Sequence, residues 1–195
     1  IYCRKKGALD AREEIMLNVN EMAEGYTYFN VRGFKVSEDN NLMAYGVDTV
    51  SRRRYTLYLK DLRTGKTIDR PVPNTEGYVA WRNDNKTFFY TMKDSVTLRS
   101  DKIFRHKIGT DPANDALVYT EKDETFSTGI TKTKSKKYLV IYSASTLTND
   151  YQILEANEPE GQFRSFSPRE RGVEYSINHF KDRFYIVTNL DAPNF

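Results

Sequence analysis

The sequence predicts an all-β protein made of β-propeller blades, each a four-stranded antiparallel sheet. Aromatic residues make up 13% of the 195 residues, with 14 Tyr and 11 Phe. These rings favour strands, because they pack well on a pleated, half-buried surface. A strand–turn–strand unit recurs along the chain at an interval typical of propeller blades. Helical periodicity is nearly absent, so the fold class rests on strands alone.

The first segment, residues 1–26, is expected to form the end of a blade. Residues 9–22 contain several good helix formers. Residues 14–19 also fit a short strand, and we favour the strand. One turn of helix is expected to follow it at 19–23.

The recurring unit consists of two strands joined by a tight polar turn. Its second strand begins at Leu42, Thr87, Tyr138 and Phe184, so successive units lie about 45, 51 and 46 residues apart. Asp, Asn, Ser and Lys occupy the turns, where short polar side chains bond to the nearby backbone. Each of the first three units continues into a third strand and a weaker outer strand. Four antiparallel strands per unit is the architecture of one blade.

Three whole blades are therefore predicted, at 27–73, 77–120 and 124–168, and residues 171–195 begin another. Propellers usually close into a ring of about four to eight blades, which three cannot do. We therefore expect residues 1–195 to be a partial propeller domain, cut at both ends from a longer chain. Open blade edges favour an edge-to-edge dimer of such a fragment.

Composition argues against several classes of partner. The 30 basic and 27 acidic residues give a net charge of +3, too even for a nucleic-acid footprint, so no nucleic acid is expected. No apolar stretch reaches membrane-spanning length, so no membrane contact is expected. Cys3 is the single cysteine and gives no sign of an oxidising compartment. We expect a cytoplasmic location, with the periplasm left open.

Catalytic and metal motifs are also missing from the sequence. There is no Gly-x-Ser-x-Gly run, which the nucleophile of an α/β-hydrolase requires. His106 and His179 stand without a serine motif, and Cys3 is best interpreted as a packed strand residue. Metal-binding spacings and glycine-rich phosphate loops are absent. We therefore expect no catalytic residue, metal or cofactor in this chain, which is not an enzyme on its own.

Seven runs of residues, in order along the whole chain, resemble the prolyl oligopeptidase family, and most closely its oligopeptidase B (protease II) branch. They are YCRKKG at 2–7, EEIMLNVN at 13–20, AYGVD at 44–48, NDNKTFFY at 83–90, FRHKIGT at 104–110, EKDETF at 121–126 and KTKSKKY at 132–138. No single run is decisive, but the ordered series covers the chain from end to end.

The resemblance implies a serine peptidase of two domains. A seven-bladed propeller would cap an α/β-hydrolase domain with a Ser-Asp-His triad and would restrict entry to short peptides. Members of the oligopeptidase B branch cleave after Lys or Arg. This chain matches about the first half of such a propeller, so its implied partners are the hydrolase domain, expected beyond residue 195, and short peptide substrates. Two alternatives stay open: a prolyl-specific oligopeptidase, and a free-standing propeller that binds a protein.

Glu76 is the first candidate site residue. Blade geometry places the loops 47–54 and 73–77 on one face, which the resemblance implies meets the hydrolase domain. The resemblance further implies that Glu76 pairs with an arginine on the catalytic-histidine loop and latches the two domains together. An acidic residue here favours the branch specific for basic residues, since the prolyl branch would carry an aromatic one. The alternative is a solvated loop glutamate.

Arg52, Arg53 and Arg54 form the second candidate site. Arginine binds carboxylates through two parallel hydrogen bonds. We therefore expect these side chains to hold the C-terminal carboxylate of a peptide or an acidic patch on the hydrolase domain. The alternative is a solvated turn. The lysines at 132, 134, 136 and 137 flank another turn and are expected to be solvated.

Overall fold

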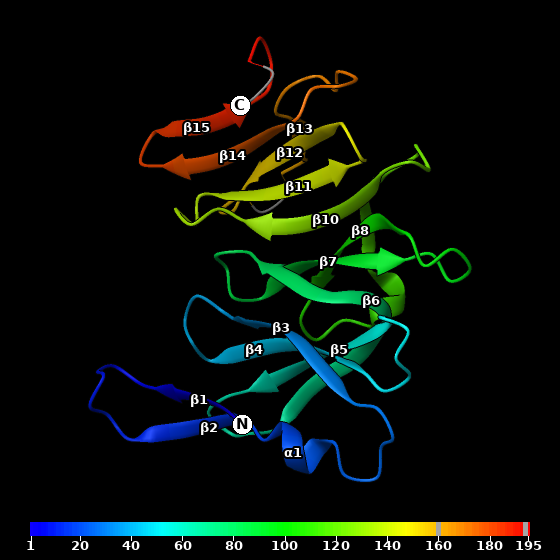
Figure 1. The fold of residues 1–195 in the computed structure, drawn as a ribbon. Coiled ribbons are helices and arrows are strands. Elements are labelled where there is room, and N and C mark those ends of the chain that lie inside the picture. The colour runs from blue at the N-terminus through cyan, green and yellow to red at the C-terminus, as the bar shows by residue number, and fades with distance from the viewer. Residues whose placement is uncertain (159–160, 193–194) are drawn as a thin grey trace.

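The computed structural model describes residues 1–158, 161–192 and 195, and nearly all of its regular structure is β-strand. The exceptions within these residues are the short helix α1 (Val19–Met22) and the 3₁₀ turn η1 (Pro112–Asn114). Every pair of neighbouring strands is antiparallel. The predicted all-β fold class is confirmed. In Figure 1 the successive units follow one another from the N-terminal hairpin to the C-terminal hairpin.

The strands form a central seven-stranded sheet, a four-stranded sheet and two terminal hairpins. The central sheet contains β3 (Asn30–Val36), β4 (Leu42–Asp48), β5 (Tyr55–Asp61), β6 (Thr67–Trp81), β7 (Thr87–Lys93), β8 (Ser100–Lys107) and β9 (Ala116–Thr120). The four-stranded sheet contains β10 (Ser127–Lys132), β11 (Tyr138–Ala144), β12 (Asn149–Glu155) and β13 (Arg164–Ser165). The hairpins pair β1 (Tyr2–Lys5) with β2 (Glu13–Leu17), and β14 (Tyr175–Phe180) with β15 (Arg183–Thr188).

Strand β6 corrects one expectation. The predicted loop 73–77 is extended backbone inside this 15-residue strand. Thr75 lies at the junction, since it faces Tyr55 in β5 and Met92 in β7. Its hydroxyl donates to the Tyr55 carbonyl at 2.9 Å and accepts from the Gly77 amide at 3.0 Å, which holds the chain extended. Two predicted units thus share one continuous sheet, and the predicted blade limits at 27–73, 77–120 and 124–168 stay a prediction.

The first turn of each unit repeats one backbone device. Asn40, Asn85, Lys136 and Lys181 all have φ between 55° and 62°, a left-handed conformation that tight turns require. In the second unit, Asp84 Oδ1 accepts the amides of residues 86 and 87 at 2.9 Å. The predicted role of Asn, Asp and Lys in these turns is therefore confirmed. The N-terminal prediction of a strand followed by one turn of helix is also correct.

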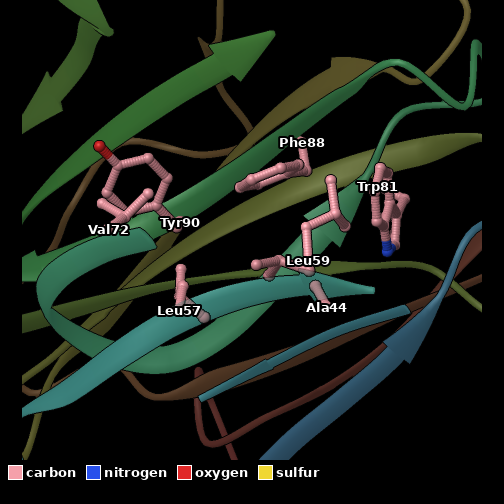
Figure 2. Packing of buried hydrophobic residues seen from close by; sticks show 8 residues of the cluster. Ala44, Leu57, Leu59, Val72, Trp81, Phe88 and Tyr90 are labelled. Atoms are coloured by element: carbon pink, nitrogen blue, oxygen red, sulfur yellow. The ribbon is translucent and has the colours of Figure 1, made fainter. Parts of the chain in front are cut away.

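The core lies between successive units. One cluster joins strands β4 to β7, and Figure 2 shows Leu57, Leu59, Trp81, Phe88 and Tyr90 gathered in it. A second cluster joins strands β6 to β8 with the four-stranded sheet. Because each unit buries its faces against its neighbours, the stack is held together by contacts between successive units.

Candidate functional site

The first strands of three successive units line one groove. They are β3, the second half of β6, and β10, and each contacts the next. The groove has a volume of about 1340 Å³. Its walls come from segments spread over residues 32–144. A hollow of this size, lined by several polar and charged side chains, is the candidate site.

Three glycines allow the strands to approach closely on one side of the groove. Gly33 has φ +72°, and a Cβ atom there would lie 1.7 Å from the carbonyl oxygen of Gly77. A Cβ atom on Gly46 would lie 2.5 Å from the Gly77 Cα. No side chain fits at these positions, so β3 and β6 touch through their backbones. This contact brings Arg32 and Glu76 to the same side of the groove.

Glu76 lines the groove with partners from its own chain. Its Oε1 lies 2.7 Å from Lys93 Nζ and accepts a hydrogen bond from the Ser100 hydroxyl. Its Oε2 lies 3.8 Å from Arg32 Nη1, and the side chain is 25% exposed. The expected loop position was wrong, because residue 76 lies within β6. The carboxylate is partly exposed at the groove and already has partners in its own chain.

Arg32 is oriented by aromatic rings. Its guanidinium carbon lies 4.2 Å from the centre of the Tyr78 ring and 4.9 Å from that of Tyr55. Burial alone would lower the pKa of Arg32, but hydrogen bonds to Tyr78 and Tyr55 outweigh it and raise the pKa above its usual value. Arg32 is therefore a fixed positive charge on the groove wall.

The predicted arginine trio is split by the structure. Asp48 is buried and accepts the amides of Val50 at 2.9 Å and Arg53 at 2.7 Å. These bonds fix the loop after β4, so that Arg52 and Arg53 line the groove together with Glu76. Arg54 points elsewhere and donates to Asn74 Oδ1 at 3.0 and 2.6 Å. Two of the three arginines thus share a surface with Glu76.

The charge of the groove is the feature that sequence reasoning missed. Nine basic and only two acidic side chains line it. The basic ones are Arg32, Lys35, Arg52, Arg53, Lys93, Arg99, Lys132, Lys134 and Lys136, and the acidic ones are Glu38 and Glu76. The whole chain carries only +3, so its remaining surface is net negative. The even overall balance conceals this segregation, which no local run of residues reveals.

Lys132, the last residue of β10, corrects the expectation that the lysines around this turn are solvated. Its ammonium group is mostly buried, lies 2.6 Å from Glu38 Oε1 and donates to Asn83 Oδ1. Lys136 pairs with the other oxygen of Glu38 at 2.7 Å. Burial raises the pKa of Glu38, but the two lysines outweigh it and hold that pKa below its usual value. Both groove carboxylates are therefore already neutralised by their own chain.

The two histidines lie outside the groove. His106 is buried, with Nδ1 2.8 Å from Asp115 Oδ1 and Nε2 3.0 Å from Asp69 Oδ2. His179 Nδ1 lies 2.8 Å from the Ser135 hydroxyl. His106 has carboxylate partners but no serine, and His179 has a serine but no carboxylate partner among the described contacts, so neither forms a set of nucleophile, base and orienting group. Within the residues that the structure describes, no group of three His, Cys, Asp or Glu could hold a metal ion, and no helix is long and apolar enough to cross a membrane.

Comparisons with known proteins agree with the resemblance found in the sequence. The family model "Prolyl oligopeptidase, N-terminal beta-propeller domain" matches residues 1–195. Dipeptidyl aminopeptidase BI of Pseudoxanthomonas mexicana is 41% identical over 95% of this chain and 26% of its own length. Protease 2 of Moraxella lacunata is 34% identical over 100% of this chain and 29% of its own length. The structure of oligopeptidase B from Leishmania major superimposes with a TM-score of 0.87 at 30% identity, covering 95% of this chain and 26% of that one. The chain thus spans between a quarter and a third of the length of these relatives.

Proposed function

This chain belongs to the prolyl oligopeptidase family, as part of its N-terminal β-propeller domain, and we propose that it forms one wall of a channel that admits short peptides to a hydrolase domain. One observation carries the proposal: the first strands of three successive units line a single groove. In a propeller, the innermost strand of each blade faces the central channel. The groove is then the part of the channel that these residues provide.

The chemistry belongs to the hydrolase domain in this proposal. Among the described contacts, the Ser135–His179 pair has no carboxylate partner, which a hydrolase triad needs. The chain therefore acts by limiting access and by contacting the hydrolase domain. For the whole protein we propose a serine peptidase of the cytoplasm that cleaves short peptides after Lys or Arg, in keeping with the oligopeptidase B and protease 2 relatives.

A second activity is supported by the relative at 41% identity, whose name is dipeptidyl aminopeptidase BI. That name describes the removal of dipeptides from an amino terminus. The same gating wall would serve either activity, because both act on chains narrow enough to enter a channel. The choice between the two activities therefore concerns the whole protein, and the proposed role of this chain is the same in both cases.

We propose that Glu76 takes part in an interdomain latch. Its carboxylate lies at the groove among Lys93, Ser100 and Arg32. An arginine from the hydrolase domain would join this cluster rather than find an unpaired acid. Because Glu76 already has partners, we expect its loss to weaken closure by less than the ~2–5 kcal/mol typical of a truncated buried pair.

The terminal hairpins are proposed to meet the remaining blades. Ile15 in β2 and the run 185–187 in β15 are exposed apolar residues. Exposed apolar surface of this kind marks an interface. In the full propeller, neighbouring blades would cover it, and in the isolated chain the same surface would favour the edge-to-edge dimer.

Hydrolysis of three chromogenic substrates tests the proposal. The first carries a blocked amino terminus and ends in Arg, the second is blocked and ends in Pro, and the third is a dipeptide with a free amino terminus. We expect the 195-residue chain to cleave none and the full-length protein to cleave the Arg substrate. Cleavage of the free dipeptide alone would select the aminopeptidase activity, and cleavage after Pro would overturn the basic specificity. Hydrolysis by the chain alone would contradict the gating role.

A further inference from the structure

The groove is strongly basic, with nine basic and two acidic side chains. We infer that it binds the acidic part of a peptide, through carboxylate side chains or a free C-terminal carboxylate, and so favours acidic peptides among those that enter. The inference rests on the proposed function, since it names the substrate class that this wall would select. It goes further, because cleavage after a basic residue says nothing about charge elsewhere in the peptide.

Four cations in the groove have no acidic partner. Among the ion pairs of the described residues, none involves Lys35, Arg52, Arg53 or Lys134. The two groove carboxylates cannot neutralise them, because each is already engaged by a lysine: Glu38 by Lys132 and Lys136, Glu76 by Lys93. A ligand with several negative charges would supply the missing partners.

These cations are spread along the groove. Arg52 and Arg53 lie in the loop after β4, at the end where β3 begins. Lys134 lies in the turn after β10, whose neighbours Lys132 and Lys136 bond Glu38 in the turn after β3. The two groups therefore occupy opposite ends of the inner strands. An extended chain with spaced carboxylates matches this arrangement better than a single small anion.

The arginine pair is held ready to bind. The bonds from Asp48 to the loop amides fix the backbone, and Ser51 and Arg53 have φ of 59° and 54°. A fixed loop loses little freedom when a ligand binds. Planar guanidinium groups suit carboxylates through paired hydrogen bonds. A hollow lined by one sign of charge also concentrates ligands of the opposite sign.

Fluorescence anisotropy of labelled peptides on the full-length protein tests the inference. The probes are two octapeptides of alternating Gly and Glu, or Gly and Gln, each made with a free and with an amidated C-terminus. The label blocks their amino terminus and they contain no Lys, Arg or Pro, so neither proposed activity cleaves them and binding is measured without hydrolysis. A single-stranded oligonucleotide of eight nucleotides is the third probe.

We expect the Glu peptide to bind at least ~10-fold more tightly than the Gln peptide at low salt, and this difference to shrink as salt screens the charges. The free and amidated forms separate the terminal carboxylate from the side chains as the source of binding. Equal binding of all four peptides, or no binding of any of them, would overturn the inference. Tighter binding of the oligonucleotide would overturn it in favour of nucleic acid.

Variants locate the binding. R52Q/R53Q is expected to weaken the Glu peptide ~5-fold or more, and K35Q/K134Q is the second pair should the first fail to fold. R164Q/R171Q removes two exposed arginines outside the groove and is expected to change affinity less than ~2-fold. If the control variant loses as much affinity for the Glu peptide, binding depends on overall charge, and the assignment to the groove is contradicted. If the unsubstituted full-length protein binds the Glu peptide but cleaves none of the three chromogenic substrates, the proposed peptidase activity is contradicted and the binding inference is not.

Discussion

The centre of the stack and its terminal hairpins use similar strands in different surroundings. Phe89 in β7 is 1% exposed and packs in the cluster between the central and four-stranded sheets. Phe180 in β14 is 60% exposed, although its strand is fully paired with β15. β7 is paired on both sides, with β6 and β8, whereas β14 is paired only with β15, so the two places differ in pairing as well as in burial. The comparison teaches that the centre of this chain is stabilised by the stacking of units in addition to strand pairing.

The largest expected loss of stability comes from truncating a buried ring at the centre of the stack. Phe89→Ala removes a ring from the packed cluster and should lower the free energy of unfolding by about 3–5 kcal/mol. Phe180→Ala is the matched control and should cost less than ~1 kcal/mol, because the ring is already exposed. Urea unfolding followed by circular dichroism measures both. Equal losses would mean that the terminal hairpin is packed as firmly as the centre.

The contact between β3 and β6 gives the next effect. Gly33→Ala should destabilise the chain by about 2–4 kcal/mol, since its Cβ would collide with the Gly77 carbonyl and φ is +72°. Gly65→Ala controls for backbone strain, because Gly65 has φ +73° with open space around it, and should cost about 1–2 kcal/mol. Thermal unfolding compares the two. If both variants lose the same amount, the close approach contributes nothing.

Buried ion pairs of His106 should make the stability of the central sheet depend on pH. The His106 ring faces Asp69 from β6, Asp115 beyond η1 and the ring of Phe88 from β7, and Asp115 also accepts a hydrogen bond from the Tyr90 hydroxyl. Burial alone would lower the pKa of His106, but the carboxylates of Asp115 and Asp69 outweigh it and raise that pKa above 6.5.

The interaction of His106 with Asp69 and Asp115 should contribute fully to the free energy of unfolding below pH ~6.5. This contribution should be lost as the pH rises through the higher pKa of folded His106. The loss should be about 1.4 kcal/mol for each pH unit by which the folded pKa of His106 exceeds the unfolded one. Urea unfolding from about pH 5 to about pH 9 measures it. His106→Gln should remove the dependence, and His179→Gln should leave it in place. A stability that rises across this pH range in the unsubstituted chain would show that the histidine is neutral when folded.

The smallest expected change in stability comes from the arginines that we assign to ligand binding. R52Q/R53Q should change the free energy of unfolding by less than ~0.5 kcal/mol, because neither side chain has a partner among the described contacts. The fixed loop depends on the Arg53 amide, which the substitution retains. Differential scanning fluorimetry checks this. A larger loss would show that the arginines stabilise the fold and would weaken their assignment to a ligand.

Sequence reasoning located the hairpins well, because their signals are local. Turn residues such as Asn85 and Lys136 act on their own backbone, so composition and spacing were enough. The continuous strand β6 escaped prediction, since Pro73 and Gly77 resemble a loop. What holds that segment extended is the pairing of Thr75 with two strands far away in sequence. The resemblance singled out Glu76 but gave no sign of its partners Lys93 and Ser100.

The sequence by itself determined the fold class, the repeated unit and the family, because each depends on residues close together or on an ordered series of motifs. Only the tertiary structure decided the charge of the groove. Its nine cations come from segments between residues 32 and 136 that meet only when units stack. Periodicity determines which residues form strands, but the faces that units bury against one another determine which charges come together. An evenly balanced chain can thus present a strongly basic groove.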